Sequence, residues 1–150
     1  MTLSKYPLGN ADVNALRKYQ SLLAVILFAA LYLVVGVAFP NPPASNKFQF
    51  MWRLVAWLIC AVAFAIHIFL EYFRFRNLPG RTALHVAIAV ALGAFGLAAA
   101  ANIHSLSSGT GDQRLLVLAL VLWPLITGVP AFVVAFVVAT VLAKLKLRLT

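Results

Sequence analysis

Four long stretches without a single Asp, Glu, Lys or Arg constrain this chain more than any other feature of its sequence. They contain 28, 17, 30 and 29 residues and correspond to residues 19–46, 54–70, 82–111 and 115–143. A helix that crosses the hydrocarbon core of a membrane needs ~20 mostly apolar residues. Three stretches exceed that length, and the second reaches it when its apolar flanking residues are included. None alternates polar and apolar residues as a strand of a membrane barrel does.

We therefore predict an all-α integral membrane protein, a single domain of residues 1–150 folded as a four-helix transmembrane bundle of up-down topology. A cytoplasmic segment of residues 1–18 comes first, and the spans lie near residues 19–39, 51–73, 82–104 and 115–143. Prolines at 40–43 and the Asn-Leu-Pro-Gly turn at 77–80 separate neighbouring spans, because proline cannot continue a helix. The chain has 64% hydrophobic and 10% charged residues. A typical soluble domain has ~45–50% apolar and ~25% charged residues, so the composition also indicates a membrane protein.

The basic residues predict the orientation, since Lys and Arg in short loops remain on the cytoplasmic side. The chain has 12 basic and 3 acidic residues and a formal net charge of +9. Nine basic residues fall on one side: Lys5, Arg17, Lys18, Arg74, Arg76, Arg81, Lys144, Lys146 and Arg148. The other side has three: Lys47, Arg53 and Arg114. We expect both termini in the cytoplasm and the protein in the plasma membrane, taken as a bacterial inner membrane. The lipid bilayer accounts for the positive charge without a nucleic-acid partner.

Polar residues within the second span fall on one face of the helix. At 100° per residue, an arc of about 100° collects Arg53, Trp57, Cys60, Phe64, His67, Glu71 and Arg74. This polar stripe is expected to face the other helices and to form interhelical hydrogen bonds. Cys60 is the only cysteine, so no disulfide can form within the chain.

His67, Glu71 and His85 form the candidate site. His67 and Glu71 are neighbours at i,i+4, and the short turn before the third span predicts that His85 lies at a similar depth. Ionisable residues inside a membrane usually face the bundle interior or a water-filled path. Two histidines and a carboxylate can hold a transition metal or relay protons, and two histidines on facing helices can ligate haem. No metal or other cofactor is required by the sequence.

The third and fourth spans are expected to have packing roles. Small residues four apart in the third span, such as Ala89 and Gly93, let helices approach closely in lipid. The fourth span contains a predicted kink at Pro124, Thr127, Gly128 and Pro130. There, Thr127 is expected to satisfy a carbonyl that a proline leaves free.

Three functions remain open at this stage. No nucleophile with a base, phosphate loop or pair of acids indicates an enzyme. The small size and the packing surfaces favour a structural or accessory subunit of a larger membrane complex. The alternative is a homo-oligomeric transporter or channel with a proton or cation site at His67, Glu71 and His85. A metal- or haem-binding membrane protein is the third.

Overall fold

The computed structural model describes residues 10–39, 46–109 and 112–149, and within them the chain is helical apart from the short connections between helices. Side chains are described for residues 13–39, 50–109 and 112–145. The elements are α1 (Asn10–Ala38), α2 (Asn46–Phe69), a π-helical turn η1 (Leu70–Arg74), α3 (Pro79–Ser108) and α4 (Gln113–Leu149). Four helical segments are long and apolar enough to cross a membrane. The predicted all-helical membrane fold is therefore confirmed.

The helices are longer than the predicted spans. The membrane-spanning candidates are Val13–Ala38, Phe50–Arg74, Pro79–Ser108 and Gln113–Leu145. Residues 10–18, expected to precede the first span, already belong to α1. The predicted proline-rich connection at 40–43 and the first nine residues lie outside the described residues.

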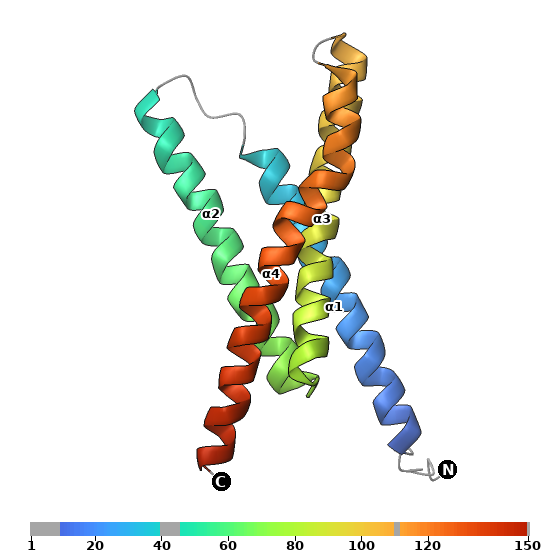
Figure 1. Cartoon of the computed structure of the whole chain (residues 1–150), viewed down its shortest axis with the longest axis vertical. Helices are drawn as coiled ribbons and strands as arrows, with labels where there is room; N and C mark the ends of the chain where they lie inside the picture. Colours follow the sequence, from blue (N-terminus) through green and yellow to red (C-terminus); the bar gives the residue numbers. More distant parts are fainter. Residues whose placement is uncertain (1–9, 40–45, 110–111, 150) are drawn as a thin grey trace, which may run out of the picture.

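The four helices run in alternating directions, so α1 begins and α4 ends at the same end of the molecule (Figure 1). The turn between α2 and α3 also lies at this end, which we call the terminal end. Helix α3 packs most extensively against α4 and next against α1, whereas α2 makes far fewer contacts with its neighbours. Near the opposite end α2 diverges from α4 (Figure 1).

Small residues set the distance between α1 and α3. A Cβ atom added to Gly93 would lie 2.6 Å from Tyr32 Cβ and 3.1 Å from the carbonyl oxygen of Ala29. Ala89, one turn earlier in α3, is fully buried against Val25 and Ala29 of α1. Ala89 and Gly93 are one of the pairs of small residues expected in the third span, and both lie against α1.

Helices α3 and α4 also approach closely, and a polar contact joins them. A Cβ atom on Gly128 would lie 3.1 Å from Ala91 Cβ. Asn102 donates from Nδ2 to the carbonyl oxygens of Ala98, at 2.9 Å, and of Leu116, at 2.7 Å. Asn102 thus links α3 to the first turns of α4.

Pro124 and Pro130 are accommodated within a single continuous helix, α4. A proline removes the hydrogen bond to the carbonyl four residues before it, which leaves Leu120 and Ile126 without that partner. Thr127 Oγ1 instead donates to the carbonyl oxygens of Trp123, at 2.8 Å, and Pro124, at 3.3 Å. The expectation that Thr127 satisfies a freed carbonyl is wrong, because a threonine reaches only the carbonyls three or four residues before it.

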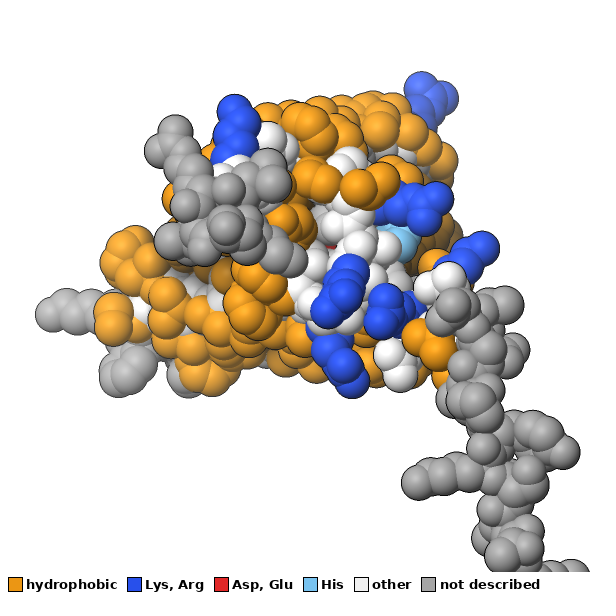
Figure 2. Space-filling model, turned by 90° about the horizontal axis from the view of Figure 1, so that it is seen from below, with side chains coloured by type: hydrophobic (Ala, Val, Ile, Leu, Met, Phe, Trp, Pro, Cys, Tyr) orange, Lys and Arg blue, Asp and Glu red, His pale blue; other side chains and the backbone are white. Residues whose placement is uncertain are grey.

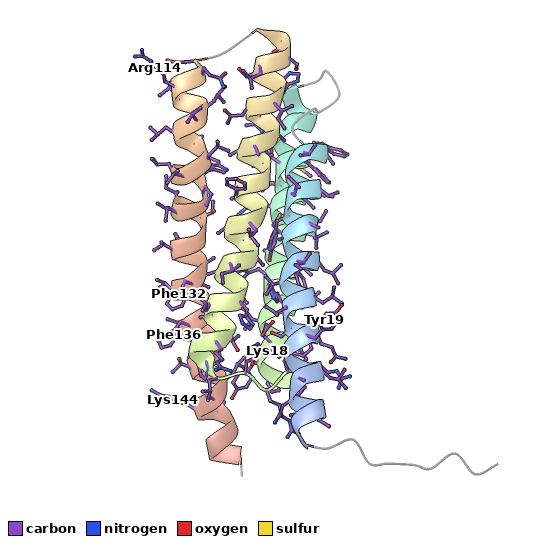
Figure 3. The ribbon with its side chains drawn as sticks, turned by 90° about the vertical axis from the view of Figure 1, so that its right-hand side faces the viewer. Lys18, Tyr19, Arg114, Phe132, Phe136 and Lys144 are labelled. Atoms are coloured by element: carbon purple, nitrogen blue, oxygen red, sulfur yellow. The ribbon has the colours of Figure 1, made fainter. Side chains whose placement is uncertain are left out.

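Large apolar side chains cover the outside of the molecule. Leu, Ile, Val and Phe side chains are exposed along all four helices, whereas most residues of the small core are alanine. Phe132 and Phe136 stack on each other along α4, with ring centroids 6.1 Å apart (Figure 3). A soluble protein rarely exposes apolar surface so continuously. This distribution fits a protein whose outer surface contacts lipid.

Candidate functional site

The candidate site is centred on the carboxylate of Glu71, which is fully buried. Ser21 of α1 donates from Oγ to both carboxylate oxygens, at 2.9 and 3.0 Å. Asn77 Nδ2 donates to Oε2 at 2.5 Å. His85 of α3 places Nδ1 3.1 Å from Oε2 and 2.8 Å from Ser21 Oγ. One carboxylate therefore connects α1, η1, the following turn and α3.

The backbone around Glu71 explains how Asn77 reaches it. Leu70–Arg74 form a π-helical turn, a local insertion that is frequent at functional sites. Arg76 then adopts a left-handed conformation with φ of 55°, which is uncommon for a residue other than glycine. The chain folds back so that the backbone N–H of Asn77 donates to the backbone carbonyl oxygen of Glu71 at 3.1 Å. Pro79 begins α3, where a missing N–H costs nothing.

This geometry accommodates two positions of a proton. With Glu71 ionised, Ser21 and Asn77 donate to it, and a proton on His85 Nδ1 is shared between Glu71 and the Ser21 oxygen. With Glu71 protonated, its O–H can donate to an unprotonated His85 Nδ1. Both arrangements satisfy the carboxyl group without moving a heavy atom, because a histidine nitrogen can act as donor or acceptor.

His67 lies on the other side of Glu71, and its side chain forms no hydrogen bond with the residues that the structure describes. Its side chain is fully buried and stacks on Phe28 of α1, with centroids 4.3 Å apart and an interplanar angle of 7°. Its Nε2 is 3.7 Å from Glu71 Oε1, an ion-pair distance that exceeds a hydrogen bond. In the described part of the chain neither ring nitrogen has a hydrogen-bond partner. A buried polar group without a partner is destabilising and is often associated with function.

His85 connects this site to the surface. Its side chain is 22% exposed, whereas those of Glu71 and His67 are 0% exposed. Viewed from the terminal end, Lys and Arg side chains surround a polar region in which a histidine side chain is visible (Figure 2). Lys18 and Lys144 lie toward this end, and Arg114 lies at the other (Figure 3).

The structure brings His67, Glu71 and His85 together, as their spacing predicts, but separates the rest of the polar stripe. Arg53 and Cys60 line a groove farther along α2. Arg74 is exposed, and its guanidinium forms no ion pair with Glu71 among the described residues. Those residues also contain no group of three His, Cys, Asp or Glu arranged to hold a metal ion.

Three contributors to the site were not among the predicted residues: Ser21, Asn77 and Phe28. Ser21 is one of few polar residues within the first span, which is a signal in itself. Its contact with Glu71, 50 residues away, depends on the rotation of α1, which the weak periodicity of that helix does not define. Asn77 falls in a predicted turn, where a polar residue is ordinary.

No protein-family model, no curated protein and no solved structure matches this chain. The residues and their geometry are therefore the basis for assigning a function.

Proposed function

We propose that this protein handles protons within the membrane, with Glu71 as the central proton-binding group between His85 and His67. The observation that carries the proposal is the position of His67. A purely structural hydrogen-bond cluster would satisfy its buried groups, whereas neither His67 nitrogen has a hydrogen-bond partner among the described residues, although a carboxylate with several hydrogen bonds of its own lies beside the ring.

The proton transfers follow from the distances. Water at the terminal end protonates His85, and the proton on Nδ1 passes to Glu71 Oε2 across 3.1 Å. Glu71 then carries it as a neutral carboxylic acid, which is far less costly in a membrane than a charge. The proton is then on Oε2, so the carboxyl group must rotate to bring the protonated oxygen to the Oε1 position, and the present 3.7 Å to His67 Nε2 must shorten to about 3 Å. Each transfer returns the donor to its previous charge.

We also propose that the terminal end faces the cytoplasm of a cell with a bacterial-type inner membrane. Six of the basic side chains that the structure describes belong to this end, namely Arg17, Lys18, Arg74, Arg76, Arg81 and Lys144. Arg53 and Arg114 belong to the other end. The excess of Lys and Arg supports an orientation with both termini inside. His85 then exchanges protons with the cytoplasm, and a homo-oligomer would provide the enclosed path that four helices alone lack.

Proton flux in reconstituted vesicles tests the proposal. The purified protein is placed in liposomes that contain a pH-sensitive dye, and an external pH step is applied with a potassium ionophore to cancel the membrane potential. We expect proton flux through the wild type and a loss of at least about tenfold in Glu71→Gln, since an amide retains hydrogen bonds but carries no exchangeable acid. His67→Gln should lose flux similarly.

A histidine outside the site serves as a control for a general effect of replacing histidine on proton flux. His104 is exposed near the opposite end of α3, so His104→Gln should leave the flux unchanged. If wild-type vesicles conduct no more protons than empty ones, or if Glu71→Gln conducts normally, the proposal is wrong. A Glu71→Gln variant that changes only the melting temperature would indicate a structural cluster and an accessory subunit.

A further inference from the structure

A large groove lies among the four helices, next to the polar site but separate from it. Its volume is about 950 Å³, and residues of α1, α2, α3 and α4 line it. This is near the upper end of the ~300–1,000 Å³ range of small-molecule sites. Its lining includes residues of both α2 and α4, which share few contacts and diverge toward the end opposite the termini (Figure 1).

The groove is apolar along its length and charged at one place. Trp57, Phe64 and Trp123 contribute aromatic walls. Arg53 is the only charged residue that lines it in the described part of the chain, three residues after the start of the candidate span Phe50–Arg74. This depth corresponds to the headgroup region of a bilayer. The groove thus has the Arg53 cation at the level of the membrane interface and apolar walls below it.

A second feature inside the groove indicates a ligand with polar groups. The hydroxyl of Tyr32 is buried in the wall of the groove and has no hydrogen-bond partner among the residues described. Buried Tyr hydroxyls usually have one. Tyr32 lines the groove, and a rotation of its ring would bring the hydroxyl to the groove, where an ester carbonyl of a lipid would accept the hydrogen bond.

We propose that the groove binds an anionic phospholipid, with its phosphate at Arg53 and an acyl chain along the apolar walls. Arginine matches phosphate through two parallel hydrogen bonds. A zwitterionic lipid carries a cationic group that opposes Arg53, so the site discriminates by net charge. The binding does not depend on proton transfer by Glu71.

Native mass spectrometry of the protein released from detergent tests this binding. Phosphatidylglycerol and phosphatidylcholine with identical acyl chains are titrated separately, and the bound fraction is measured. We expect phosphatidylglycerol to bind about fivefold more tightly, as one basic residue near an anionic headgroup provides. Arg53→Gln should reduce its binding to that of phosphatidylcholine, whereas Arg114→Gln, with an exposed arginine at the same end (Figure 3), should not.

Two alanine-to-phenylalanine variants give an independent test in which the charge of the groove is unchanged. Ala61 lines the groove and is exposed, so Ala61→Phe should fill the groove without disturbing the core and should weaken binding of both lipids. Ala65, exposed one turn further along α2 and outside the groove, is the control as Ala65→Phe. Equal binding of the two lipids by the wild type overturns the proposal. So do equal losses in Arg53→Gln and Arg114→Gln, or full binding by Ala61→Phe.

Discussion

Replacing Gly93 with alanine should separate α1 from α3. The added Cβ would lie 2.6 Å from Tyr32 Cβ and 3.1 Å from the carbonyl oxygen of Ala29. Nonbonded carbon atoms prefer ~3.5–4.0 Å, so the helices must move apart by about 1 Å. Neither atom can yield alone, because one is backbone and the other is attached directly to it.

The magnitude follows from two opposing contributions. Overpacking a well-packed interface costs ~1–3 kcal/mol, and rigid partners place Gly93 at the upper end. Alanine is favoured over glycine within a helix by ~1 kcal/mol. The net loss in the free energy of unfolding should therefore be about 2 kcal/mol.

Thermal unfolding in a mild detergent, followed by circular dichroism, measures the change. Gly80→Ala is the matched control, because Gly80 also belongs to α3 and its added Cβ would meet nothing within 4 Å. It should be neutral or slightly stabilising. If Gly93→Ala melts at or above the temperature of Gly80→Ala, the close crossing of α1 and α3 is refuted.

Three further substitutions test other contacts by the same unfolding assay. Ser21→Ala removes two hydrogen bonds from buried Glu71 and should cost ~1–3 kcal/mol; an unchanged melting temperature would contradict this contact. Asn102→Ala removes the bond to the carbonyl of Leu116 and should cost ~1 kcal/mol, and a stabilised variant would show that α3 and α4 are not joined there. Arg76→Gly relieves a left-handed conformation and should stabilise the protein by ~0.5–1 kcal/mol. Destabilisation by Arg76→Gly would indicate that the arginine side chain has a contact of its own.

The sequence predicts the helices well because the signal for a membrane span is local. A run of about twenty apolar residues has few alternatives in lipid, where backbone groups must bond within the helix. The pairing of His67 with Glu71 is local in the same sense, since it needs only one helical turn. His85 follows from the shortness of the connection between its helix and theirs.

What the sequence does not predict depends on how helices rotate and where they are interrupted. Ser21 meets Glu71 only because α1 presents that face to η1 and to the start of α3. The π-helical turn adds a residue to the last turn of the second span, so the regular 100° spacing no longer applies to Arg74. The left-handed Arg76 places Asn77 over Glu71, and no propensity rule selects an arginine for that conformation.

The residues of the polar stripe of α2 have two different surroundings in the structure. Arg53, Trp57, Cys60 and Phe64 line the groove, whereas His67 and Glu71 belong to the buried site. Different contacts hold the two parts. The site is fixed by the short turn to α3 and by α1, while the groove is bounded by the half of α2 that diverges from α4. Because α2 has few other contacts, lipid in the groove would stabilise that half of the helix without altering the distances around Glu71. The proposed proton handling and the proposed lipid binding would thus be mechanically separable, although both depend on one helix face.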